Sequence, residues 1–137
     1  MDMLKAVAAV RELLADQSRW TREAEARNGF GDPVDPLDDE AERFCISGAF
    51  IRIANPEIGS YKTYLRLATQ AVRELGGGPQ DDLWTFNDRT DTTHDRVMAL
   101  LDRMAELAAA EDSAQWRRAL AEEGIPFAPK PRRPRLN

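Results

Sequence analysis

Residues that bind metals or form cross-links are scarce in this sequence. Its 137 residues include one cysteine, Cys45, and one histidine, His94. A lone cysteine excludes an intrachain disulfide, so nothing indicates an oxidising compartment. One Cys and one His are too few for the usual zinc sites, and the carboxylates at positions 35–40 lack the spacing and glycine of a calcium-binding loop. We therefore expect neither a metal nor a cofactor.

Long hydrophobic runs are absent as well. Charged residues interrupt every apolar segment within a few positions, whereas a membrane span needs roughly 18 apolar residues. Lys5 and Arg11 break the apolar stretch near the N-terminus, where a secretory signal needs an unbroken hydrophobic centre. We therefore expect a cytoplasmic protein that does not contact the membrane.

Sequence motifs of common enzyme classes are also missing. No P-loop, dinucleotide-binding fingerprint or nucleophile elbow occurs. A nucleophilic pair of Cys45 and His94 would need a stabilised thiolate and donors for an oxyanion. Cys45 is instead predicted to lie two turns into a helix on an apolar face, where cysteine is an inert hydrophobe. We expect no catalytic residue. A non-enzymatic role is favoured, and an enzymatic role is kept as the alternative.

The chain is rich in charge, which is unevenly distributed around a net charge of -5. The last eight residues contain four bases and no acid, which leaves 15 bases and 24 acids in the other 129 residues. Such an acidic body repels phosphates, so we expect nucleic acid to bind only through the tail, if at all. The Pro/Arg-rich tail, residues 126–137, is predicted to be extended, either as a solvated end or as a partner-binding segment with the candidate residues Lys130, Arg132, Arg133 and Arg135.

Hydrophobic periodicity predicts a mainly α (α+β) fold, with about five helices packed around one core. The expected N-caps are Asp2, Asp38 and either Thr92 or Thr93, and the glycines 76–78 are an expected stop. A connection is predicted across positions 84–88. The five helices are predicted at residues 4–16, 38–54, 60–75, 92–108 and 113–123, within a single domain of residues 1–125.

A small β-hairpin is predicted near residues 19–34. Trp20, Arg22, Ala24 and Ala26 lie on alternate positions, and Asn28-Gly29 supplies turn residues that tolerate a positive φ. Pro33 limits how far the second strand can pair, because proline has no backbone N–H.

Polar residues gather around the predicted start of the helix that covers residues 92–108. Its unpaired N–H groups and dipole could hold an anion there. Alternatively, the same residues form a turn and a cap, and His94 ties the loop to the body. The candidate ligand-binding residues are Trp84, Asn87, Asp88, Thr92, Thr93 and His94.

Several short motifs in register resemble an uncharacterised family of small bacterial and phage proteins with a domain of unknown function. The resemblance covers roughly Leu4 to Leu107 and implies no activity. It implies a bacterial or prophage setting, and that the hairpin, the Cys45 face and the His94 turn belong together. The motifs are Trp20-Thr21, Asp35-Pro36-Leu37-Asp38, Cys45-Ile46-Ser47-Gly48-Ala49, Asn87-Asp88 and Thr92-Thr93-His94, with Val97 and Leu101-Asp102.

These observations favour a non-enzymatic interaction or regulatory protein that binds a macromolecular partner, expected to be a protein; one included case is interference with a basic nucleic-acid-binding protein through charge complementarity. One alternative is a small-molecule or anion-binding domain, or a weak hydrolase, that uses the turn at Asn87, Asp88, Thr93 and His94 with Trp84 as a wall. Another is tethering to nucleic acid through the tail. The sequence leaves the oligomeric state open.

Overall fold

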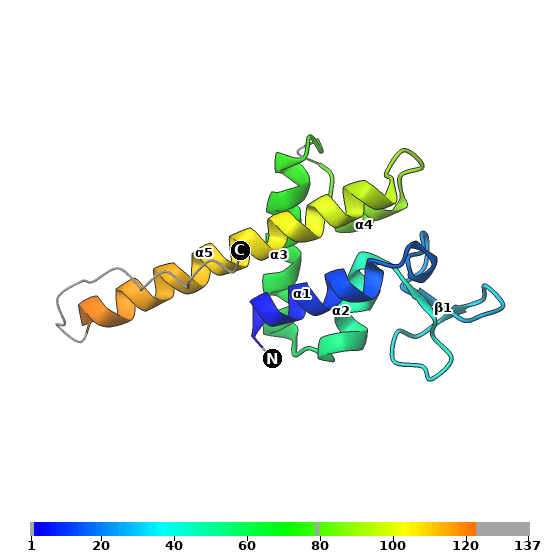
Figure 1. Cartoon of the computed structure of the whole chain (residues 1–137), viewed down its shortest axis with the longest axis horizontal. Coiled ribbons are helices and arrows are strands. Elements are labelled where there is room, and N and C mark those ends of the chain that lie inside the picture. The colour runs from blue at the N-terminus through cyan, green and yellow to red at the C-terminus, as the bar shows by residue number, and fades with distance from the viewer. Residues whose placement is uncertain (1, 79, 123–137) are drawn as a thin grey trace, which may run out of the picture.

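The fold is a helical body with a small sheet at one end (Figure 1). The computed structural model describes residues 2–78 and 80–122, and the mainly α fold class with its small sheet is confirmed there. The predicted tail with its four candidate bases lies outside the described residues. The described elements are α1 (Met3–Leu14), η1, a 3-10 helix (Gln17–Arg19), β1 (Ala26–Arg27), β2 (Pro33–Val34), β3 (Arg43–Phe44), α2 (Ile46–Ala54), α3 (Ile58–Glu74), α4 (Leu83–Asp88) and α5 (His94–Glu122).

Helices α1 and α3 lie close to their predicted ranges because local signals set their ends. Asp2 caps α1 as expected, since its side chain accepts a 2.8 Å hydrogen bond from the N–H of Lys5. At the end of α3, Gly76 has a φ of 92°. The N–H of Gly77 donates to the carbonyl of Val72 at 2.9 Å, which completes a Schellman motif.

The prediction of a helix from Asp38 onward is wrong for the residues before Ile46. The carboxylate of Asp38 accepts a hydrogen bond from the N–H of Glu40 in a local turn, so it caps no helix. Arg43 and Phe44 then form strand β3. Cys45, predicted to lie inside the helix, is instead the N-cap of α2.

Two further predictions are wrong around α4 and α5. The predicted connection contains α4, which Asp82 caps by accepting a 2.8 Å hydrogen bond from the N–H of Thr85. The two predicted C-terminal helices are one helix, α5, because no glycine or proline interrupts residues 94–122. Its second half extends beyond the rest of the helical body (Figure 1). None of the helices in the described ranges combines the length and hydrophobicity that a membrane crossing needs.

The predicted hairpin exists, but it is shorter and belongs to a three-stranded antiparallel sheet of order β2-β1-β3. Ala26 in β1 faces Val34 on one side and Phe44 on the other. The prediction that the alternation starts a strand near Trp20 is wrong, because residues 17–19 form η1 and Trp20 makes only an isolated bridge to Phe44. Pro33 lies in the edge strand β2, as its missing N–H requires.

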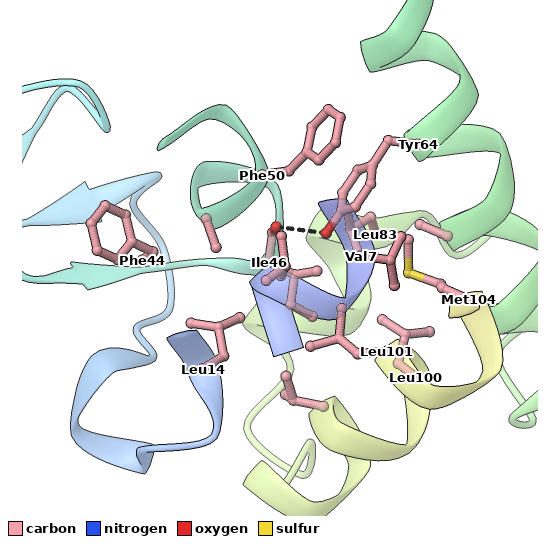
Figure 2. Close-up of a cluster of buried hydrophobic side chains, with 14 of the residues drawn as sticks. Val7, Leu14, Phe44, Ile46, Phe50, Tyr64, Leu83, Leu100, Leu101 and Met104 are labelled. Atoms are coloured by element: carbon pink, nitrogen blue, oxygen red, sulfur yellow. Dashed lines mark hydrogen bonds between the residues drawn. The ribbon is translucent and has the colours of Figure 1, made fainter. Parts of the chain in front are cut away.

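The core lies where α1, α2, α3 and α5 meet (Figure 2). Tyr64 is fully buried at its centre, with its ring stacked on that of Phe50 at 4.0 Å. Its hydroxyl donates a 3.0 Å hydrogen bond to the carbonyl of Ile46, drawn as the dashed line in Figure 2. Helix α5 adds Val97, Leu100, Leu101 and Met104 to the core.

Candidate functional site

Asn87 lies at the centre of the predicted polar site, with an exposed fraction of 1%. Its Oδ1 accepts hydrogen bonds from the indole N–H of Trp20 at 2.9 Å and from the N–H of Ile46 at 3.1 Å. Its Nδ2 donates to the carbonyl of Thr21 and to the carboxylate of Asp88, both at 3.0 Å. All four hydrogen-bonding positions of the amide are therefore used. We call these five residues the Asn87 cluster.

The two acid–base groups of the site, Asp88 and His94, are bonded to backbone. Asp88 accepts a 2.8 Å hydrogen bond from the N–H of Glu23, which has a φ of 63°. His94 is half-buried, and its Nε2 lies 2.6 Å from the carbonyl oxygen of Leu14. Because a carbonyl can only accept, Nε2 carries the proton in this contact. Both side chains thus fasten distant segments to the turn between α4 and α5.

Thr92 and Thr93 directly precede α5, whereas Trp84 lies in α4. Thr93 is the side-chain cap of α5, because its Oγ1 accepts from the N–H of Arg96 at 3.2 Å. Thr92 is buried, whereas Trp84 is 39% exposed on α4. The structure therefore brings Asn87, Asp88, Thr92, Thr93 and His94 to one turn, with Trp84 at the surface beside it.

Arg22 also belongs to this region, and sequence reasoning missed it. Its guanidinium lies 4.4 Å from the centre of the Trp20 ring, in a cation–π contact. Nη2 donates to the carbonyl of Thr92, and Nε donates to the carbonyl of Arg89 at 3.2 Å. The alternation that suggested a strand through Arg22 gave no sign of the two hydrogen bonds, because their acceptors lie 67 and 70 positions away.

Cys45 is held in its unreactive form. Its Sγ accepts a 3.2 Å hydrogen bond from the N–H of Gly48, and the residue is 3% exposed. Burial raises the pKa of the thiol to about 11, and the hydrogen bond from Gly48 only partly offsets that rise. The side chain of His94 bonds instead to α1, so imidazole and thiol are not joined by a hydrogen bond.

Surface clefts do not converge on the centre of the site. Among five prominent clefts in residues 2–78 and 80–122, the most voluminous of the five holds about 740 Å³ and is lined by residues 16–20, Glu42 and Arg43. Trp84, Asn87 and His94 line none of the five. Thr92 lines a cleft of about 260 Å³ together with Arg89 and Arg96. Arg89 already donates to the carboxylate of Asp91, and Arg96 donates to the carbonyl of Leu75. No cluster of metal-ligand side chains occurs in the same residue ranges.

A second candidate surface is the segment of residues 23–42, which we call the hairpin arm. It carries eight acids, all exposed, and one base, Arg27. None of the eight forms an ion pair with a described residue. Arg22 and Arg43 flank the arm at its base. The excess of acids was evident from the sequence, but their position on one projection was not, because this segment was predicted to form a hairpin followed by a helix.

The tip of the hairpin arm is Phe30, with an exposed fraction of 93%. Asn28 organises the turn, because its Oδ1 accepts 3.0 Å hydrogen bonds from the N–H groups of Phe30 and Asp32. Sequence reasoning located the turn from Asn28-Gly29 but did not single out Phe30. An aromatic residue inside an Asn-Gly turn is a signal that could have done so.

The comparisons with known proteins give a family but no activity. Residues 2–107 match a family model described as a family of unknown function, DUF6197. No curated protein and no solved structure matches the chain. The matched range includes the hairpin arm, the Asn87 cluster and the first half of α5.

Proposed function

Because the chain belongs to DUF6197, a family of unknown function, we propose its function from its own geometry. It is a non-enzymatic interaction or regulatory protein that acts by binding a macromolecular partner. The observation that carries this proposal is the hairpin arm, which gathers eight exposed acids on one projection. Its setting, as expected from the sequence, is the cytoplasm of a bacterium or of a cell that carries a prophage.

The charge of the hairpin arm supports a basic partner. Arg27, its one base, is turned inward, since its guanidinium donates to the carbonyls of Gly31 and Arg22. The carboxylates are thus free to create a negative field over the arm. Such a field accelerates association with a positive surface and repels nucleic acid, so the partner is a protein with a basic face, such as a nucleic-acid-binding protein.

The use of the polar residues at the α4–α5 turn supports binding over catalysis. Asn87, Asp88 and His94 are each bonded to backbone atoms of distant segments. Side chains that act on a substrate need free donors or acceptors facing an open cleft. These three line none of the five clefts, so their geometry fits a structural role.

The proposal is tested by affinity capture from the native host with the full chain. We expect recovery of one protein in stoichiometric amount, with retention that falls as salt rises. Removing three of the eight negative charges of the arm, with Asp32→Asn, Asp39→Asn and Glu40→Gln, should abolish recovery. A control that removes the same charge elsewhere, Glu12→Gln with Glu57→Gln and Glu122→Gln, should retain the partner.

Three outcomes would contradict the proposal. Repeated recovery of no stoichiometric protein would remove the binding role. Equal loss in the arm variant and the control variant would show that only total charge matters. Recovery of nucleic acid alone would shift the function to Lys130, Arg132, Arg133 and Arg135.

A further inference from the structure

The tip of the hairpin arm presents an aromatic side chain almost entirely to solvent. Phe30 is 93% exposed, more than any other large hydrophobic residue in the described ranges. A single exposed hydrophobe is common on protein surfaces. This one differs because the backbone around it is held in one conformation.

Asn28 fixes that conformation from inside the turn. Its side chain accepts from the N–H groups of Phe30 and Asp32, and its own N–H donates to the carbonyl of Asp32 at 3.0 Å. Its carbonyl accepts from the N–H of Gly31, which has a φ of 85°. Asn28 is 9% exposed, so it serves the turn and not the solvent.

Arg27 adds a second brace. Its Nη1 donates a 2.9 Å hydrogen bond to the carbonyl of Gly31, and its Nε donates to Oγ1 of Thr21 at 3.1 Å. One guanidinium therefore links the tip of the arm to its base. This arrangement lowers the entropy that the tip would lose on binding.

The base of the arm is fixed to the helical body. The carbonyl of Glu25 accepts a 3.1 Å hydrogen bond from the N–H of Cys45. It also lies against Gly48 of α2, so closely that a Cβ at that position would be 1.9 Å from the carbonyl oxygen. The arm is thus held to the helical body at its base, and Phe30 lies at the opposite tip.

We infer that Phe30 is the anchor of the proposed interaction, and that it inserts into an apolar pocket framed by Lys and Arg side chains on a basic protein. This inference rests on the proposed function and adds its contact residue and the chemistry of the partner's pocket. An aromatic ring on a braced turn buries a large apolar area with few rotatable bonds. The surrounding acids complement a basic rim and steer the approach.

Two other occupants fit the charges less well. A second copy of the chain brings the same eight acids, so the two arms would repel each other. An anionic membrane would repel them too, although a single exposed aromatic can enter an interface. A basic protein satisfies both the apolar tip and its acidic surroundings.

The first experiment places a photo-crosslinking residue, p-benzoylphenylalanine, at position 30 of the full chain in host cells. The control carries it at position 58, where Ile58 is 70% exposed at the start of α3. We expect crosslinks from position 30 to one protein, at an apolar peptide segment flanked by Lys or Arg. Crosslinks to many proteins, or the same products from both positions, would overturn the inference.

The second experiment measures the affinity of that purified protein for variants of the full chain. Phe30→Ala should weaken binding at least tenfold, Phe30→Leu less, and the control Ile58→Ala less than twofold. Because Phe30 contacts little of the chain, the urea midpoint should stay unchanged, which excludes unfolding as the cause. Equal affinities of the Phe30 and Ile58 variants would overturn the inference and leave the proposed function standing.

Two probes identify the competing occupants. Sedimentation of the full chain over a range of concentrations tests for a second copy, and phosphatidylcholine vesicles test for a lipid surface. We expect a monomer and no vesicle binding from the arm. Association or vesicle binding that Phe30→Ala removes would overturn the inference, whereas recovery of no partner by the wild-type chain would end the proposed function as well.

Discussion

The indole nitrogen of Trp20 donates a 2.9 Å hydrogen bond to Oδ1 of Asn87, 67 positions further along the chain. The same oxygen accepts the backbone N–H of Ile46, the first residue of α2. One buried amide therefore joins the segment after α1, the start of α2 and the end of α4. Its loss would leave several buried groups without partners at once.

We predict that Asn87→Ala lowers the free energy of unfolding by about 2–4 kcal/mol, because the N–H groups of Trp20 and Ile46 become unsatisfied inside the protein. Urea denaturation followed by circular dichroism measures the change. Trp20→Phe removes only one donor and should cost about 1–2 kcal/mol. Additive losses in the double variant would contradict a direct link between the two side chains.

Gly48 and Gly59 form a matched pair for a second prediction. Alanine at position 48 would collide with the carbonyl of Glu25, so Gly48→Ala should cost about 3 kcal/mol or more. A Cβ at position 59 meets nothing within 4 Å, and Gly59→Ala should stabilise α3 by about 0.5 kcal/mol. Thermal unfolding of both variants checks the signs, and similar effects at the two positions would refute the close contact.

The thiol of Cys45 gives a pH-dependent prediction. Its pKa is about 11 in the folded protein against an ordinary value of 9.0, so between these values the folded state holds a proton that the unfolded state releases. The contribution of the thiol to the free energy of unfolding is fully present below pH 9. It falls by about 2–3 kcal/mol as the pH rises to 11. Burial also raises the pKa of Tyr64 well above its ordinary value, which adds a pH dependence of its own, so the test is the difference between wild type and Cys45→Ser. If the difference in the free energy of unfolding between the two proteins stays constant from pH 8 to 11, the prediction is wrong.

Arg22 supplies a fourth prediction. Arg22→Lys keeps the charge but cannot bond the carbonyls of Arg89 and Thr92 in the same geometry while lying over Trp20. We expect a loss of about 1–2 kcal/mol in urea unfolding. Arg19→Lys, at an exposed position of η1, is the control and should change stability by less than about 0.5 kcal/mol. Equal losses in Arg22→Lys and Arg19→Lys would show that replacing any arginine with lysine causes the loss, and not the contacts of Arg22.

The sequence predicted those elements whose limits are local. Asp2 and Gly76 set the start of α1 and the end of α3 through bonds to residues within one turn. The helix at residues 38–45 was wrong because an aspartate that caps a helix and one that closes a turn look alike in sequence. Pairing of β3 with β1, a tertiary contact, decided between them.

The candidate site was predicted in the same uneven way. Asn87, Asp88 and His94 do meet at one turn, because they are close in sequence. Their partners are not close: Ile46 is 41 positions from Asn87, and Leu14 is 80 positions from His94. Phe30 was missed for a different reason, since an exposed aromatic residue leaves no periodic pattern and its one sequence signal is its place in the Asn28-Gly29 turn.

Pro33 limits how any partner can approach the sheet. Strand β2 is an outer strand, and its proline offers no N–H for a neighbouring chain to bond. Stacking of further copies onto that side is therefore discouraged, which protects the protein from growing into ribbons. A molecule that docks there would bind mainly to side chains, because strand addition is weakened by the N–H that Pro33 lacks.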